Sequence, residues 1–95
     1  MTDPPLLILS SLAESDKHGY AMMEDIAGFA GVQLGPGTLY GAITRLEQAG
    51  WIRPVKSTDR RQPYTITATG RRHLAEELES LSRVLKTGRK RLETT

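Results

Sequence analysis

The side chains best suited to recognise another molecule lie on one face of a predicted helix, which begins at Pro36 and stops at Gly50. At about 100° per residue, Leu39, Ile43 and Leu46 mark its buried direction. The opposite face and its flanks are small or hydrogen-bonding, with almost no negative charge. Side chains of this kind can reach base edges in the major groove of DNA. The residues concerned are Gly37, Thr38, Tyr40, Gly41, Thr44, Arg45 and Gln48.

Each polar group on this face has a chemical use. Thr44, Arg45 and Gln48 are able to hydrogen-bond to base edges. Thr38 and the free N–H groups of the first helical turn suit a phosphate oxygen, and the Tyr40 hydroxyl can donate to one. A merely solvated helix with glycines tuned for packing is the alternative. Two glycines in a helix interior weaken it by roughly 1 kcal/mol each, and this cost favours a functional face.

A second group of polar residues lies in a predicted hairpin, where the hydrophobic period changes from about 3.6 to about 2. Residues 51–56 and 63–67 are expected to form its strands, joined by a polar turn. Segment 51–62 has four cations and one acid. Adjacent arginines at a hairpin tip suit phosphate or minor-groove contact, although a turn kept soluble by charge would look the same. The cations expected to contact DNA are Lys56, Arg60 and Arg61.

A long last helix is predicted from about Ala68 to Leu92. Its leucines repeat with the 4-3-4 spacing of heptad positions a and d. About 25 residues span some 37 Å at 1.5 Å per residue, more than a small domain covers, so we expect a symmetric homodimer. Packing of the helix on its own domain is the competing interpretation. The stripe comprises Leu74, Leu78, Leu81 and Leu85, and a basic tail, Arg89-Lys90-Arg91, follows it.

Two shorter helices are predicted ahead of these elements. Asp3 and Pro4 are suited to begin the first one. The second is expected to bury a face that includes Tyr20, Met23 and Ile26.

Helix, helix, linker, helix, β-ribbon and helix is the element order of a winged helix-turn-helix, whose third helix enters the DNA major groove. The predicted fold is therefore mainly α with a small β-hairpin. We expect a winged helix-turn-helix domain over residues 1–67 and a dimerisation helix with a basic tail over residues 68–95.

Composition narrows the function classes. The chain has 95 residues, no cysteine and a formal net charge of +2. The lack of cysteine removes disulfides, thiolate metal sites and cysteine nucleophiles. Two histidines lie far apart without a ligand cluster, so we expect no enzyme, no metal and no cofactor. The longest apolar stretch, Leu6 to Leu9, is too short for a membrane span, and a cytoplasmic protein is expected.

The small net charge conceals an imbalance. Residues 1–50 hold two cations and six acids, whereas residues 51–95 hold eleven cations and five acids. This asymmetry points to a polyanionic partner contacted mainly by one part of the chain. The acidic first half argues against nonspecific DNA binding, because it would repel DNA except along one defined face.

Short motifs in order carry a family resemblance. They are HGY at residues 18–20, PGTLY at 36–40, RLEQAGWI at 45–52 and YTITATGR at 64–71. With these motifs the sequence closely resembles the PadR family of bacterial transcriptional regulators over nearly its whole length.

The resemblance implies a dimeric winged-helix transcription factor, usually a repressor released from DNA by a small molecule or another signal. By position, Tyr20, Thr38 and Tyr40 match family residues that touch the DNA backbone. Arg60 and Arg61 match the basic tip of the family's wing. Family wings often carry a glycine at the tip, and this turn has none, so we expect its geometry to differ.

The expected partners are double-stranded DNA, with a pseudo-palindromic operator, and a second copy of the chain. A small-molecule effector is expected at the dimer interface, between the first and last helices, where Trp51 and Phe29 are either pocket or core residues. The competing function is a winged helix that binds another protein and no DNA. It predicts an apolar exposed stripe on the third helix and no basic wing, the reverse of this sequence.

Overall fold

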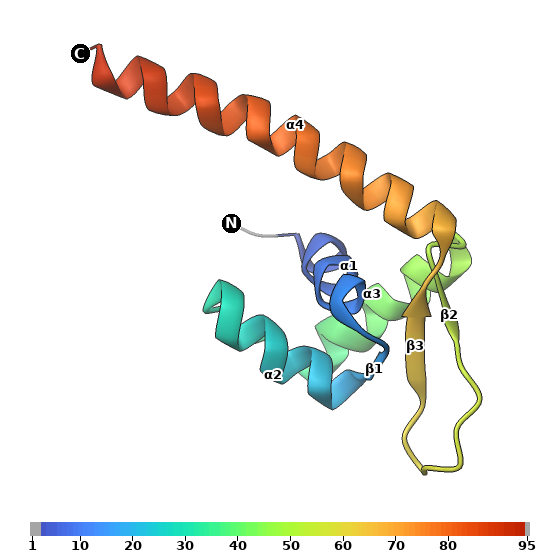
Figure 1. Ribbon diagram of the computed structural model, residues 1–95. Helices are drawn as coiled ribbons and strands as arrows, with labels where there is room; N and C mark the ends of the chain where they lie inside the picture. The colour runs from blue at the N-terminus through green and yellow to red at the C-terminus, as the bar shows by residue number, and fades with distance from the viewer. Residues whose placement is uncertain (1–2, 95) are drawn as a thin grey trace.

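Residues 3–94, which the computed structural model describes, form a helical domain with a small sheet at one edge and one long projecting helix (Figure 1). The predicted fold class, mainly α with a β-hairpin in a winged helix-turn-helix, is confirmed. In chain order the elements are α1 (Pro4–Glu14), β1 (Lys17–His18), α2 (Gly19–Ala30), α3 (Pro36–Gln48), β2 (Ile52–Pro54), β3 (Pro63–Ile66) and α4 (Ala68–Glu93).

Local signals in the sequence explain where the helices begin and end. Pro4 stands in the first turn of α1, although the side chain of Asp3 makes no capping hydrogen bond. The Nδ1 atom of His18 accepts a hydrogen bond from the amide of Ala21, 3.3 Å away, at the start of α2. Helix α2 ends at Gly31, whose φ of 66° is a left-handed conformation that glycine adopts at little cost.

The sheet has three strands, in the order β1-β3-β2, and both pairings are antiparallel. The predicted two-stranded ribbon is therefore wrong in strand number. Lys17 pairs with Tyr64 and His18 with Pro63, so the segment before α2 adds an edge strand to the hairpin. The hairpin strands are also shorter than predicted, because the ladder between Ile52 and Ile66 ends at Pro54 opposite Tyr64.

The core lies between α1, α2, α3 and the sheet. All four predicted inward residues of α3, Leu39, Ala42, Ile43 and Leu46, are buried as expected. The other buried apolar residues are Leu7, Ile8, Leu9, Leu12, Met22, Ile26, Ile52, Ile66 and Leu74.

The predicted inner face of α2 is rotated from the observed one. Met22 and Ile26 are buried, whereas Tyr20 is 56% exposed and Met23 is only partly buried. Several large apolar residues follow one another at the start of this helix, so the sequence allows more than one inward face.

Helix α4 leaves the domain after its second turn (Figure 1). Leu74 is buried in the core at 7% exposure, whereas Leu78, Leu81 and Leu85 are 46–52% exposed. The helix contacts α1 near its start, and the molecule is 56 Å long. The exposed leucine stripe therefore begins at Leu78, and no helix in the described part of the chain is long and apolar enough to cross a membrane.

The start of α4 is fixed tightly against the end of α3. The hydroxyl of Thr67 accepts from the amide of Gly70 at 3.0 Å and donates to the carbonyl oxygen of Gly50 at 2.7 Å. The amide of Thr67 donates to the carbonyl oxygen of Trp51 at 3.0 Å. A Cβ atom at Gly70 would collide with that same carbonyl oxygen, so only glycine fits here.

Candidate nucleic-acid interface

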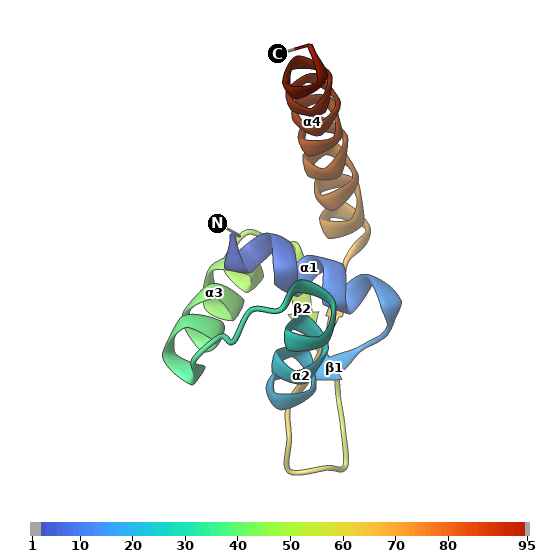
Figure 2. The same cartoon turned by 90° about the vertical axis from the view of Figure 1, so that its left-hand side faces the viewer.

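The exposed face of α3 and the hairpin tip both lie away from the projecting end of α4 (Figure 2). Of the eleven residues expected to contact DNA, ten are exposed and Gly41 is partly buried. The exposed residues are Tyr20, Gly37, Thr38, Tyr40, Thr44, Arg45, Gln48, Lys56, Arg60 and Arg61. No acidic residue lies among them, so the surface carries donors and acceptors without a repulsive carboxylate.

A shallow cleft of about 290 Å³ brings four of these residues together. Tyr20 and Tyr40 come from the two helices, and Arg60 and Arg61 come from the hairpin tip. The remaining predicted contact residues do not line the cleft. Sequence reasoning did not assign contact roles to three further lining residues, His18, Gly19 and Gln62.

Gly19 is the reason that Tyr40 can lie across the start of α2. Gly19 is buried, and a Cβ atom at this position would collide with the Tyr40 hydroxyl and lie 2.8 Å from its Cζ atom. The motif at 18–20 therefore serves the motif at 36–40, since a bare backbone leaves room for the ring. The Tyr40 side chain is held at one edge yet stays 48% exposed.

Gly19→Ala is expected to swing the Tyr40 ring outward and to weaken DNA binding about fivefold, because contacts of this kind couple by roughly 0.5–3 kcal/mol. The measurement is a binding titration on wild type, Gly19→Ala, Tyr40→Ala and the double variant. In the Tyr40→Ala background the glycine substitution should have little further effect. An equal loss in both backgrounds would disprove the coupling.

Arg61 reaches across the cleft towards α2. Its guanidinium nitrogen lies 3.1 Å from Nε2 of His18, while Nδ1 of that ring accepts from Ala21. A neutral imidazole has a single acceptor nitrogen, so His18 cannot accept from both groups at once. The capping bond to Ala21 leaves the proton on Nε2, and the guanidinium donors of Arg61 remain available to an anion.

The hairpin tip is ordered by short polar side chains in place of a glycine. The Ser57 hydroxyl accepts from the amide of Asp59 at 3.0 Å, and the Asp59 carboxylate accepts from the amide of Arg61 at 3.4 Å. The Gln62 side chain donates to the carbonyl oxygens of Val55 and Pro63. These bonds turn the chain through 57–62 and leave the arginine side chains in solvent.

Two hydrogen-bonding groups near α3 have restricted roles. The Thr44 hydroxyl donates to the carbonyl oxygen of Tyr40 at 3.0 Å, so towards a ligand it acts as an acceptor. Burial raises the pKa of the Tyr64 hydroxyl, and the nearby Glu47 and Tyr40 raise that pKa further. Tyr64 therefore stays a neutral donor beside the face of α3.

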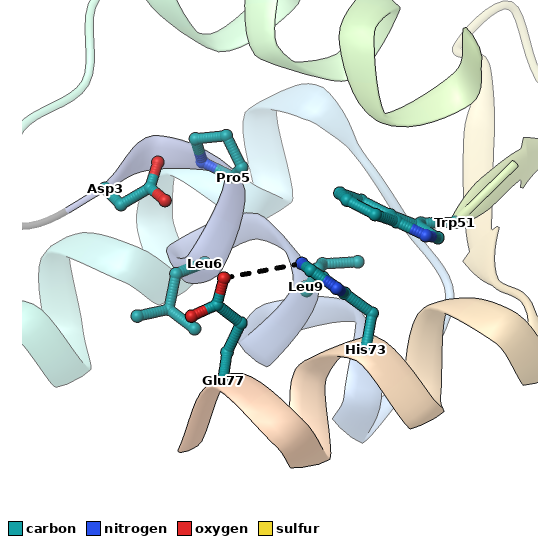
Figure 3. A pocket seen from close by; sticks show the side chains of 7 residues that line it. All are labelled: Asp3, Pro5, Leu6, Leu9, Trp51, His73 and Glu77. Atoms are coloured by element: carbon teal, nitrogen blue, oxygen red, sulfur yellow. Dashed lines mark ion pairs between the residues drawn. The ribbon is translucent and has the colours of Figure 1, made fainter. Parts of the chain in front are cut away.

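A second cleft, of about 260 Å³, lies on the other side of the domain between α1, Trp51 and α4 (Figure 3). The rings of Trp51 and His73 stack at 3.7 Å with an interplanar angle of 11°. Nε2 of His73 lies 3.6 Å from the Glu77 carboxylate. Phe29, the other aromatic considered for an effector pocket, is 52% exposed and does not line this cleft. Within residues 3–94 no group of three or more metal-ligating side chains is found.

Known proteins resemble the chain over most of its length. The transcriptional regulator PadR-like family matches residues 8–76. A transcriptional regulator from Clostridium thermocellum has a TM-score of 0.82 at 30% identity, covering 92% of this chain and 87% of that one. A PadR family transcriptional regulator from Eggerthella lenta has a TM-score of 0.76 at 32% identity, covering 96% and 81%.

A curated relative is longer than this chain. A 37.1 kDa protein in a transposon of Streptomyces fradiae is 40% identical over 82 residues, which are 86% of this chain. The chain spans about a quarter of that relative, 24% of its length.

The helix pair α2–α3, the hairpin beside it and the exposed polar face of α3 define a winged helix-turn-helix protein. The chain belongs to the transcriptional regulator PadR-like family, a family of transcription regulators and not of enzymes.

Proposed function

We propose that the chain is a sequence-specific DNA-binding regulator that represses transcription as a homodimer. The observation that carries the proposal is the acid-free face of α3, which shares one side of the molecule with Tyr20 and the hairpin arginines. Membership of a family of transcription regulators supports the same function.

The proposal divides the contacts by chemistry. Helix α3 lies in the major groove, where Thr44, Arg45 and Gln48 reach base edges and the small residues Gly37 and Gly41 allow close approach. Backbone phosphates are contacted by groups at the helix starts and in the wing. These phosphate contacts are Tyr20, Thr38, Tyr40, Lys56, Arg60 and Arg61.

The second part of the proposal is dimerisation through residues 68–95, with the winged helix over residues 1–67 acting as the DNA reader. Three half-exposed leucines on α4, Leu78, Leu81 and Leu85, support it, because a helix that projects from its domain needs apolar cover. A twofold dimer would present two copies of α3 to a pseudo-palindromic operator.

We further propose that a small molecule relieves repression by binding between α1 and α4. The cleft around Trp51 supports this site, since it combines the apolar side chains of Leu6 and Leu9 with an aromatic stack and a carboxylate. A ligand bound there would touch the base of α4 and so act on the dimer.

A module that binds protein and no DNA is the rival function. The described face of α3 opposes it, because that face is polar and the hairpin tip carries two exposed arginines. The test is a salt-dependent binding assay on the DNA upstream of the protein's own gene. Binding no tighter there than on random DNA of equal length would eliminate the DNA-regulator proposal.

The wing makes a separate prediction. Arg60→Ala combined with Arg61→Ala is expected to reduce the slope of log affinity against log salt by about 1 for each phosphate that a subunit no longer neutralises. The exposed pair Arg83→Ala with Lys86→Ala, on α4, is the control matched in charge. A slope unchanged by the wing variant, or changed equally by both, would remove the wing from the contact surface.

A further inference from the structure

Charge is segregated along the projecting part of α4. An acidic segment, Glu76, Glu77 and Glu79, precedes the exposed leucines, and a basic segment, Arg89, Lys90 and Arg91, follows them. All six side chains are exposed. Opposite charges thus stand at the two ends of one apolar stripe.

This pattern selects between the two ways of pairing two copies of α4. In a parallel pair the acidic segments would lie together and the basic segments would lie together, and like charges repel. In an antiparallel pair each acidic segment lies beside the basic segment of the other copy. Because both segments flank the same stripe, charge complementarity favours the antiparallel pair.

The apolar positions also match in this orientation. About a twofold axis at Arg83, Leu81 of one copy faces Leu85 of the other, and Leu78 faces Gly88. Gly88 has open space around it, so it can receive a leucine from a second helix. Val84, which is 67% exposed, lies next to its own counterpart at the axis.

The same register brings the end of one α4 to the Trp51 cleft of the other copy. Nine residues from the axis, about 13.5 Å at 1.5 Å per residue, Leu92 reaches the level of Leu74, next to His73. The cleft offers Leu6, Leu9 and the Trp51–His73 stack to an apolar side chain (Figure 3). Asp3 and Glu77 at its edge offer negative charge to a basic segment.

We propose that the occupant of the Trp51 cleft is the last turn of α4 from a second copy of this chain, docked antiparallel with its basic segment against Asp3 and Glu77. The inference rests on the proposed homodimer and specifies how it is built. An effector that enters the cleft then competes with the second copy's helix, which would link ligand binding to dimer dissociation.

Charge reversal tests the orientation. The acidic segment is changed with Glu76→Lys, Glu77→Lys and Glu79→Lys, and the basic segment with Arg89→Glu, Lys90→Glu and Arg91→Glu. Either reversal alone is expected to raise the dimer dissociation constant at least tenfold at low salt, and both together should restore it. Sedimentation equilibrium on the full chain measures the constants.

The outcomes separate the two proposals. A wild-type chain that stays monomeric at every concentration ends the proposed homodimer and this inference with it. A wild-type dimer that all three variants preserve equally ends only the antiparallel arrangement. All six positions are exposed, so far-UV circular dichroism should show unchanged folding, and the doubly reversed variant verifies it functionally.

Fluorescence tests the cleft itself, because Trp51 is the only tryptophan in the chain. Dilution through the dimer–monomer transition is expected to shift its emission to longer wavelength as the terminal turn leaves. Leu92→Ser should reduce this shift while Thr87→Ser, on the same helix, should leave it intact. Dissociation with no change in Trp51 emission would show that the cleft is not the docking site.

Discussion

Replacing Leu81 and Leu85 together by aspartate is expected to leave the chain folded but monomeric, and to weaken operator binding by about 10²-fold or more. The folding expectation follows from burial, since both leucines are about half exposed and lie outside the core. In the proposed dimer the same two side chains meet at the twofold axis. Four carboxylates gathered there would repel one another.

The decrease in DNA affinity comes from the absence of two-site binding. When one reading domain is bound, a tether holds the second near its half-site at a high effective concentration, and a monomer forfeits that advantage. Gel-shift titration with the full operator and with a single half-site measures this. The variant should bind the half-site nearly as well as wild type does.

Ser80→Asp with Thr87→Asp is the matched control, because these exposed residues lie off the leucine stripe of the same helix. It should stay dimeric and bind normally. A Leu81/Leu85 variant that remains dimeric would show that α4 is not the dimer element. A monomer with full operator affinity would show instead that the two half-sites are not read together.

Gly70→Ala is expected to lower the free energy of unfolding by about 2–3 kcal/mol, and the Tm by roughly 10–20 °C. Alanine ordinarily favours a helix over glycine by about 1 kcal/mol. Here the new methyl would collide with the Trp51 carbonyl oxygen and stand 2.9 Å from a carbon of Ile66. That oxygen is held by the Thr67 amide, so the backbone cannot yield without loosening the start of α4.

Thermal unfolding followed by circular dichroism checks this expectation. Gly28→Ala on α2 is the control, because a methyl there meets nothing within 4 Å. The control should match or exceed the wild-type Tm. A Gly70→Ala protein as stable as the control would mean that the contact between α4 and the end of α3 relaxes freely.

The sequence predicted α3 and its contact face well because its apolar residues recur at strict helical spacing. Leu39, Ile43 and Leu46 leave one inward direction, and that direction fixes which side chains remain outside. The cap at Thr67 and the stop at Gly31 were equally readable, since each has a local cause. Roles in binding stay predictions until DNA is tested.

Tertiary contacts decided what the sequence did not show. The strand at Lys17–His18 has two residues in a polar stretch, and it exists only because β3 lies alongside. Its sole sequence signal is the motif that follows. Leu74 has the spacing of the exposed leucines, yet it is buried because α4 still touches α1 at that turn. Periodicity gives the direction of a face and not where cover ends.

That short strand has a thermodynamic consequence for binding. Pairing of β1 with β3 hydrogen-bonds the base of the wing to the residues that begin α2, and Lys17 is anchored to Asp25 and to α1. The reading helix and the wing therefore belong to one preassembled frame. Only the tip at 57–61 would have conformational freedom left to lose on DNA. Because ordering a residue's backbone costs about 1–2 kcal/mol, a protein built this way surrenders little entropy when it binds.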